Sequence, residues 1–121
     1  MTKVQQTIFG NHGNCLAACI ASIFEVEMSV LPTFAEMPDA WLEELNDWLR
    51  PKGLGAILIA GDDKPDGYCI RSSTRLPGRR HCCVALNGEV AWDPSPTPIL
   101  TEDGHWWVIF TALDPTKLSC T

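Results

Sequence analysis

Cys15 stands at a position where a cysteine can act as a nucleophile. It follows the turn-rich residues 10–14 and opens a run of small and apolar residues at helical spacing. Asn14 is a good N-cap residue, which would make Cys15 the first residue of the helix. The partial positive charge of a helix N-terminus lowers a thiol pKa below its usual value of about 8.5. Backbone N–H groups there can also bind an oxyanion, so this position predicts an activated nucleophile and part of an oxyanion hole.

A cysteine nucleophile needs a base, and His81 is the best placed of the three histidines. It opens a predicted strand over 81–86, directly after a loop. Asn87-Gly88 is a strong signal for a two-residue hairpin turn. This hairpin brings Asp93 about one residue from direct opposition to His81, within reach if a bulge or twist adjusts the register. A carboxylate there would orient the imidazole, so Cys15, His81 and Asp93 form a predicted triad.

Helical patterns come first in the chain and strand patterns follow. The periodicity predicts helices over 15–25 and from Pro38-Asp39 to Pro51, with Asp39 as an N-cap, and strands over 56–60, 67–73, 81–86, 89–92 and 106–112. Helices followed by an antiparallel sheet indicate an α+β fold. The length of 121 residues predicts one domain over 1–121, with a loose tail at 116–121.

Three segments together resemble the papain-like cysteine peptidase superfamily, nearest to small C39-like proteins of bacterial and phage type. They are Gly-Asn-Cys-Leu-Ala-Ala-Cys at 13–19, Arg-His-Cys-Cys-Val-Ala-Leu at 80–86 and Val-Ala-Trp-Asp-Pro-Ser at 90–95. The resemblance covers roughly residues 5–112. It implies a papain-like fold in which the cysteine helix packs on an antiparallel sheet of about four to five strands.

The resemblance also implies an activity. This is thiol-dependent acyl transfer on an amide or thioester, most simply the hydrolysis of a peptide or isopeptide by a cysteine peptidase-like hydrolase or amidase. Papain-like enzymes place a Gln before the nucleophile, and Gln6 is the candidate to complete the oxyanion hole with the N–H of Cys15. Gln5, Asn11 and Asn14 are alternatives. No metal or organic cofactor is implied.

Three further residues are predicted to contact a peptide or protein substrate. Asn14 lies directly before the nucleophile, and Trp106 could form a wall of the substrate cleft. Arg80 ends a stretch, 71–80, in which every charged residue is basic. This stretch favours an acidic or carboxylate-ended substrate.

Three other interpretations remain open at this point. The chain could be a non-catalytic binding module on the same fold, because fold alone does not establish chemistry. It could be an acyltransferase or transglutaminase-like enzyme, because the same triad can pass the acyl group to an amine. Zinc ligands could come from His12, Cys15, Cys19, His81, Cys82 and Cys83. There is no Cys-x2-Cys pair, however, and Cys82 and Cys83 would point to opposite faces of one strand, so we predict no metal site.

Charge and composition exclude some classes of partner and location. The net charge of -6 disfavours nucleic acid as a partner, because such binding rests on Lys and Arg. The first residues show no signal-peptide pattern, and no apolar run reaches the length of a membrane span. We therefore expect no membrane partner and a cytoplasmic location, where the six cysteines would stay reduced.

Overall fold

A computed structural model describes residues 1–5, 7, 14–34, 40–61, 63–76, 79–95 and 106–112, with side chains except at 73–76 and 79–80. The helices are α1 (Cys15–Phe24) and α2 (Trp41–Leu49), with 3-10 turns η1 (Met28–Val30) and η3 (Arg50–Lys52). The strands are β1 (Leu54–Ala60), β2 (Tyr68–Leu76), β3 (Arg79–Leu86), β4 (Glu89–Trp92) and β5 (Trp106–Ala112). The predicted order of helices and strands, and the α+β class, are confirmed.

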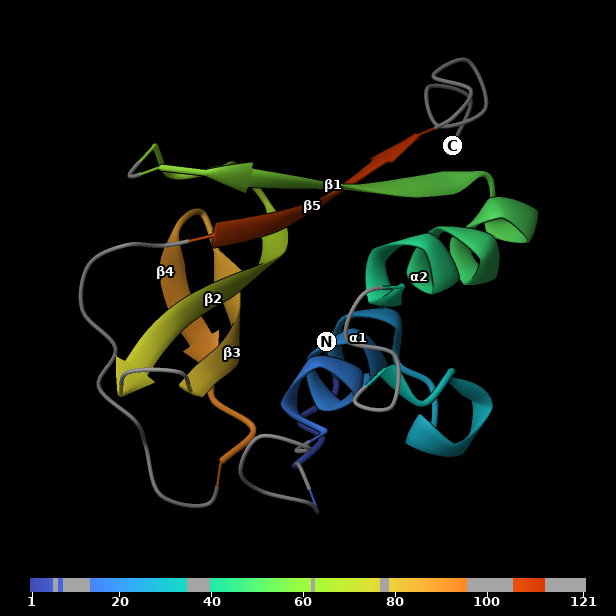
Figure 1. The fold of residues 1–121 in the computed structure, drawn as a ribbon, viewed down its shortest axis with the longest axis horizontal. Helices are drawn as coiled ribbons and strands as arrows, with labels where there is room; N and C mark the ends of the chain where they lie inside the picture. Colours follow the sequence, from blue (N-terminus) through green and yellow to red (C-terminus); the bar gives the residue numbers. More distant parts are fainter. Residues whose placement is uncertain are drawn as a thin grey trace.

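The five strands form one antiparallel sheet in the order β1-β5-β2-β3-β4. Helix α1 packs against β3 and β2 of this sheet, and α2 packs against β1 (Figure 1). The β3–β4 hairpin therefore ends the sheet on the side where α1 lies. This places the histidine and aspartate of the predicted triad next to the helix that begins with Cys15.

One hydrophobic core fills the space between the helices and the sheet. Alternate residues of the strands face it, as the two-residue period of a strand requires. Its buried members are Cys19, Ile20, Phe34, Leu45, Leu49, Ala56, Ile70, Cys82, Val84 and Val108. Full burial of one Leu, Ile or Val side chain contributes about 1.5–3 kcal/mol, so this core fixes how α1 sits on β3. Cys19 is fully buried here, as its place in the apolar stripe predicts.

The hairpin turn has the predicted form. Leu86 pairs with Glu89, and the two turn residues Asn87 and Gly88 both have positive φ, 53° and 85°. This is the conformation that an Asn-Gly turn favours. Lys64 packs so closely over Gly88 that no side chain fits there. The turn therefore sets the register of the two strands.

A β-bulge then corrects that register by one residue. Ala85 pairs with Val90 but Val84 pairs with Trp92, which leaves one extra residue on β4. A regular ladder would place Asp93 opposite Cys82, on the other face of the sheet from His81. With the bulge, the residue that follows Trp92 falls on the face of His81, and Asp93 Oδ1 lies 2.7 Å from His81 Nε2. The predicted adjustment is confirmed, and a bulge provides it.

The N-terminal segment is fastened to both α1 and β4. The N–H of Val4 donates to Ser22 Oγ at 3.0 Å, and the N–H of Thr2 donates to the carbonyl of Ser22 at 2.9 Å. The indole N–H of Trp92 donates to the carbonyl of Val4 at 2.9 Å. Residues 2–4 thus join the helix that begins with Cys15 to the strand that leads into Asp93.

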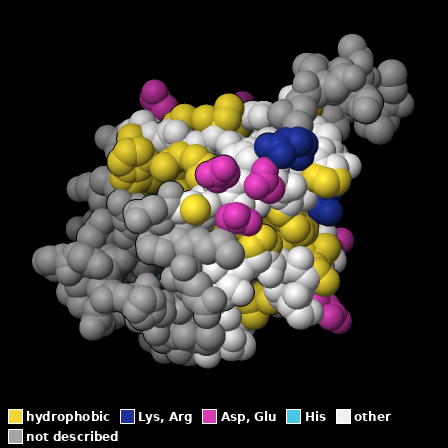
Figure 2. All heavy atoms as spheres, turned by 45° about the vertical axis from the view of Figure 1, so that its right-hand side comes forward, with side chains coloured by type: hydrophobic (Ala, Val, Ile, Leu, Met, Phe, Trp, Pro, Cys, Tyr) yellow, Lys and Arg dark blue, Asp and Glu magenta, His cyan; other side chains and the backbone are white. Residues whose placement is uncertain are grey.

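The second helix starts later than predicted. Its N-cap is Ala40, which has no side chain to accept a hydrogen bond, so the prediction of Asp39 as the N-cap was wrong. Asp39 itself lies outside the described residues. The charged side of α2 faces solvent as predicted, and Arg50 pairs with Asp47 at 2.9 Å. Figure 2 shows acidic and basic side chains gathered on the side of the molecule that carries α2.

Across the residues that the structure describes, the longest helix is α1 with 10 residues, so none is long and apolar enough to cross a bilayer.

Candidate active site

His81 and Asp93 form a buried hydrogen-bonded pair. His81 Nε2 lies 2.7 Å from Asp93 Oδ1, and the two side chains are 6% and 12% exposed. Asp93 Oδ1 also accepts the backbone N–H of Ser95 at 2.9 Å. The carboxylate is thus held in place from two sides. It fixes the orientation of the imidazole ring and leaves Nδ1 as the ring nitrogen for another partner.

Cys15, the first residue of α1, lies against β3 and is partly exposed. The side-chain hydrogen bond from Cys82 is the strongest influence on its thiol, and it favours the thiolate. Burial acts in the opposite direction. Hydrogen bonds from His81 and from the backbone of Cys82, with the charge of His81, add to the first effect and lower the pKa of Cys15 from 9.0 to about 5.

The pKa of His81 moves in the opposite direction. Burial alone would lower it, but side-chain hydrogen bonds to Cys15, Cys83 and Asp93 outweigh burial and raise the pKa from 6.5 to about 10. Between about pH 5 and about pH 10, Cys15 is therefore a thiolate and His81 an imidazolium. Over this range the two side chains carry opposite charges, so Cys15 and His81 form an ion pair.

Asn14 occupies the N-cap position, but its side chain does not cap the helix. Its Oδ1 accepts the N–H of Thr7 at 2.9 Å, and its Nδ2 donates to Thr7 Oγ1 at 2.8 Å. The prediction of a capping side chain was therefore wrong, because Thr7 takes up the acceptor. The first N–H groups of α1 are not covered by the Asn14 side chain, which is what an oxyanion site at Cys15 requires.

The other predicted oxyanion residue, Gln6, lies outside the described residues. Its neighbours in the chain are placed: Gln5 is exposed, and Thr7 is bonded to the residue before Cys15. Gln5 follows Val4, which accepts the hydrogen bond of Trp92. The chain on both sides of Gln6 is thus attached to elements of the candidate site.

Of the residues predicted to contact the substrate, Trp106 has a described side chain and Arg80 has a described backbone only. Trp106 is 39% exposed and pairs with Ser72, which in turn pairs with Cys82. These three residues form one row across the sheet on the face of α1, and two strand spacings put Trp106 roughly 10 Å from Cys82. Arg80 pairs with Thr74 through the backbone and directly precedes His81. The Arg80 side chain lies outside the described part of the chain.

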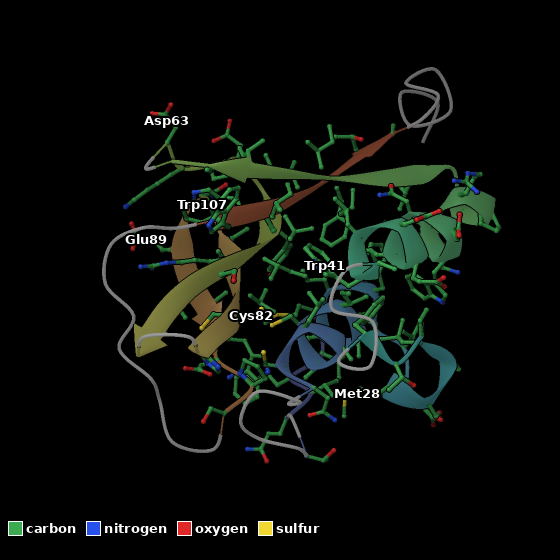
Figure 3. The ribbon with its side chains drawn as sticks, viewed as in Figure 1. Met28, Trp41, Asp63, Cys82, Glu89 and Trp107 are labelled. Atoms are coloured by element: carbon green, nitrogen blue, oxygen red, sulfur yellow. The ribbon has the colours of Figure 1, made fainter. Side chains whose placement is uncertain are left out.

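Two residues of the site were not assigned a part in it from the sequence. Cys82 and Cys83 are buried as predicted for strand cysteines, but both also contact the triad. Cys82 bonds to Cys15, and Cys83 bonds to His81. Figure 3 shows Cys82 on β3, on the side where α1 lies. The sequence feature that could have indicated these contacts is their position directly after His81 on a strand, which places one thiol on each face of the sheet.

One group among the described residues is compact enough to hold a metal ion. His81, Cys83 and Asp93 each offer a ligand atom, and these atoms lie within 4.8 Å of one another. Two ligand atoms on a tetrahedral zinc ion lie about 3.3 Å apart when each bond is about 2.0 Å. The 2.7 Å separation of His81 Nε2 and Asp93 Oδ1 is instead that of a charge-assisted hydrogen bond. The arrangement fits a proton between the two groups better than a metal ion.

Comparison of the chain with protein-family models, with curated proteins and with solved structures finds no match.

Proposed function

We propose that this chain is a cysteine-dependent acyl-transfer enzyme, a thiol peptidase or isopeptidase/amidase with a papain-like fold. The supporting observation is the 2.7 Å hydrogen bond between His81 and Asp93, beside a Cys15 thiol whose pKa is lowered to about 5. Three residues far apart in the sequence meet with the charges that such a reaction needs. A core cysteine has no need of an oriented imidazolium.

In this proposal Cys15 Sγ attacks the carbonyl carbon of an amide. The negative charge that develops on the carbonyl oxygen is held by the N–H of Cys15 and by Gln6. His81 then gives its proton to the leaving amine, and Asp93 keeps the ring in place while the proton leaves. Water, activated by the neutral His81, hydrolyses the thioester and returns Cys15.

The substrate in this proposal is a peptide or protein segment that extends from Cys15, beside Cys82, towards the partly exposed Trp106. The partly exposed indole of Trp106 supplies an apolar and aromatic surface at a distance of two to three residues of extended chain. Arg80, next to His81, adds a positive charge for an acidic or carboxylate-ended substrate. We place the enzyme in the cytoplasm, since Cys15, Cys19, Cys69, Cys82 and Cys83 are all unpaired thiols.

The test is to trap the acyl-enzyme with p-nitrophenyl acetate. We expect rapid release of one equivalent of p-nitrophenol, followed by slower turnover, and mass spectrometry should find the acetyl group on Cys15. A mixture of synthetic peptides, some with isopeptide bonds to lysine, then identifies the bond that is cleaved. Each cleaved peptide should have a new carboxylate end.

The matched control is Cys15→Ala, because alanine fits the first position of a helix and removes only the thiol. This variant should show neither the burst nor peptide cleavage. The proposal would be contradicted if both proteins released p-nitrophenol at the same rate and acetyl groups were found on surface lysines but not on Cys15. A stable acetyl-Cys15 that only an added amine releases would favour the transferase alternative.

A further inference from the structure

Cys15 and Cys82 lie at the same core cluster, where α1 packs on β3. The side chain of Cys82 donates a hydrogen bond to Cys15, and the backbone of Cys82 bonds to the same sulfur. Both side chains pack in the core cluster that joins α1 to β3. The acyl-transfer mechanism uses the Cys82 contact only to hold the thiolate. A serine or a backbone amide could do that, so the presence of a thiol there calls for a separate explanation.

We propose that Cys82 is a resolving cysteine, and that oxidation of Cys15 by a peroxide ends in a reversible Cys15–Cys82 disulfide. The inference rests on the place of both thiols at one core cluster between α1 and β3, on the hydrogen bond between them and on their different exposure. It does not require that the chain turns over a substrate. Cys15 is partly exposed, whereas Cys82 is buried. A peroxide from solvent therefore meets Cys15 first.

The reaction balances in two steps. The Cys15 thiolate attacks one oxygen of hydrogen peroxide; the S–O bond forms, the O–O bond breaks and hydroxide leaves, so sulfur is oxidised to a sulfenic acid. The sulfur of Cys82 then attacks Cys15 Sγ; the S–S bond forms and the S–O bond breaks. The leaving hydroxide takes the proton of Cys82 and departs as water. A dithiol then reduces the Cys15–Cys82 disulfide to two thiols by thiol–disulfide exchange.

The electrostatics of the pair assign these roles. The hydrogen bond to the Cys15 thiolate, followed by burial, raises the pKa of Cys82 well above its usual value. Cys82 thus keeps its proton while Cys15 is a thiolate. A sulfenic acid carries no such charge, so oxidation of Cys15 removes the main cause that holds the proton on Cys82. Cys82 becomes a better nucleophile only after there is a sulfenic acid to attack.

The neighbouring thiols are less well placed. Cys19 lies one helical turn after Cys15 and is completely buried. Cys83 alternates to the other face of β3, where it contacts His81. Both are therefore matched controls: Cys83 adjoins Cys82 in the chain, and Cys19 shares the helix of Cys15.

The experiment treats the purified full chain with hydrogen peroxide, blocks remaining thiols with iodoacetamide, and searches a non-reduced digest for cross-linked peptides. The wild type, Cys83→Ser and Cys19→Ser should each give a peptide containing Cys15 linked to one containing Cys82. Dithiothreitol should then restore full alkylation of Cys15. In Cys82→Ser the cross-link should be missing, and Cys15 should proceed to sulfinic acid, which dithiothreitol does not reverse.

Cys82→Ala is a second variant, because a small apolar residue suits this buried position if the serine hydroxyl unfolds it. The inference would be overturned if Cys15 in both Cys82 variants formed a disulfide with another cysteine and stayed protected from sulfinic acid. So would a wild type in which Cys15 accumulates sulfinic acid or remains unoxidised. Failure of the proposed function gives a different pattern: the disulfide forms normally, while p-nitrophenyl acetate and peptides are not turned over.

Discussion

Cys15 in α1 and Cys69 in β2 both pack against apolar clusters, but the pKa values of their thiols differ widely. Cys69 lies fully buried in a small cluster with Ala85 and Trp107, and burial raises the pKa of its thiol to about 11. Cys15 is also packed against the core, yet the hydrogen bond from Cys82, helped by His81, lowers its pKa to about 5. Burial alone makes a thiol inert. Burial together with hydrogen-bond donors and a positive ring makes it a nucleophile.

The largest expected effect separates these two cysteines by activity. Cys15→Ser should lose about 10⁶-fold in kcat, the size expected when a catalytic nucleophile is removed. Cys69→Ser should keep near wild-type kcat, since Cys69 is assigned no part in the reaction. Turnover of p-nitrophenyl acetate measures both. A Cys69→Ser variant that folds but is as inactive as Cys15→Ser would remove the basis of the comparison.

The second effect is the rate of alkylation at pH 6. With pKa values of about 5 and about 11, the thiolate fractions of Cys15 and Cys69 differ by about 10⁵-fold at this pH. Iodoacetamide should therefore label Cys15 and leave Cys69 unmodified, with the Cys15 rate falling only below about pH 5. Site-resolved mass spectrometry between pH 4 and pH 10 gives both profiles. Equal profiles for the two sites would mean that Cys15 has no special environment.

The third prediction concerns the orientation of the base. Asp93→Asn should lower kcat by about 10²–10⁴-fold, the usual contribution of a positioned acid–base group. It should also lower the pKa of His81, because one of the hydrogen bonds that raise it is lost. The alkaline limb of the rate profile should then move to lower pH. Glu89→Gln is the control, since Glu89 is an exposed carboxylate on the same hairpin that pairs with Lys64.

The fourth prediction is a rise in stability between about pH 5 and 6.5 that comes from Cys15 and not from Cys69. From about pH 5 to 6.5 the unfolded chain binds one more proton at this pair than the folded chain, because Cys15 is already ionised when folded. Stability from this source should therefore rise by about 2 kcal/mol over that range. It should stay level to about pH 9 and fall above it, as the unfolded thiol ionises while folded His81 keeps its proton.

Urea unfolding at several pH values measures this curve, with Cys15→Ser and Cys69→Ser in parallel. The rise below pH 6.5 should disappear in Cys15→Ser and persist in Cys69→Ser. Identical curves for all three proteins would show that no ion pair forms at Cys15.

The smallest expected effect is on substrate binding. Trp106→Ala should raise KM about tenfold, since loss of one aromatic contact in a binding site commonly costs about 1 kcal/mol or more. kcat should change little, because Trp106 lies roughly 10 Å from Cys82 across two strand spacings. Ile57→Ala is the control: Ile57 is also an exposed apolar residue, but on edge strand β1. An equal effect of both changes on KM would contradict a binding role for Trp106.

The strands and the hairpin that carry His81 and Asp93 could be predicted from local sequence. Strand periodicity and the Asn87-Gly88 turn gave the β3–β4 hairpin, and β4 was placed at 89–92, as observed. The type of residue and the approximate register were enough to bring His81 and Asp93 into one hypothesis. These are short-range properties, which neighbouring residues largely determine.

The contacts that depend on packing could not be predicted in this way. The side chain of Asn14 bonds to Thr7 rather than to the helix, because the chain before α1 folds back against it. The role of Cys82 depends on how closely α1 approaches β3, which the core sets and no local pattern records. The helix N-terminus was the expected cause of an acidic Cys15, whereas the structure gives the largest part to a thiol 67 positions later in the chain.

The bulge in the β3–β4 hairpin has a consequence for how relatives of this chain would be recognised. Since one extra residue turns Asp93 to the side of His81, the distance of 12 positions between them is itself a requirement of the proposed activity. Most substitutions within the hairpin leave this number of residues unchanged. A single insertion or deletion changes it and turns Asp93 to the face of the sheet opposite His81. Divergent homologues should therefore keep the spacing between histidine and aspartate long after the residues between them have changed.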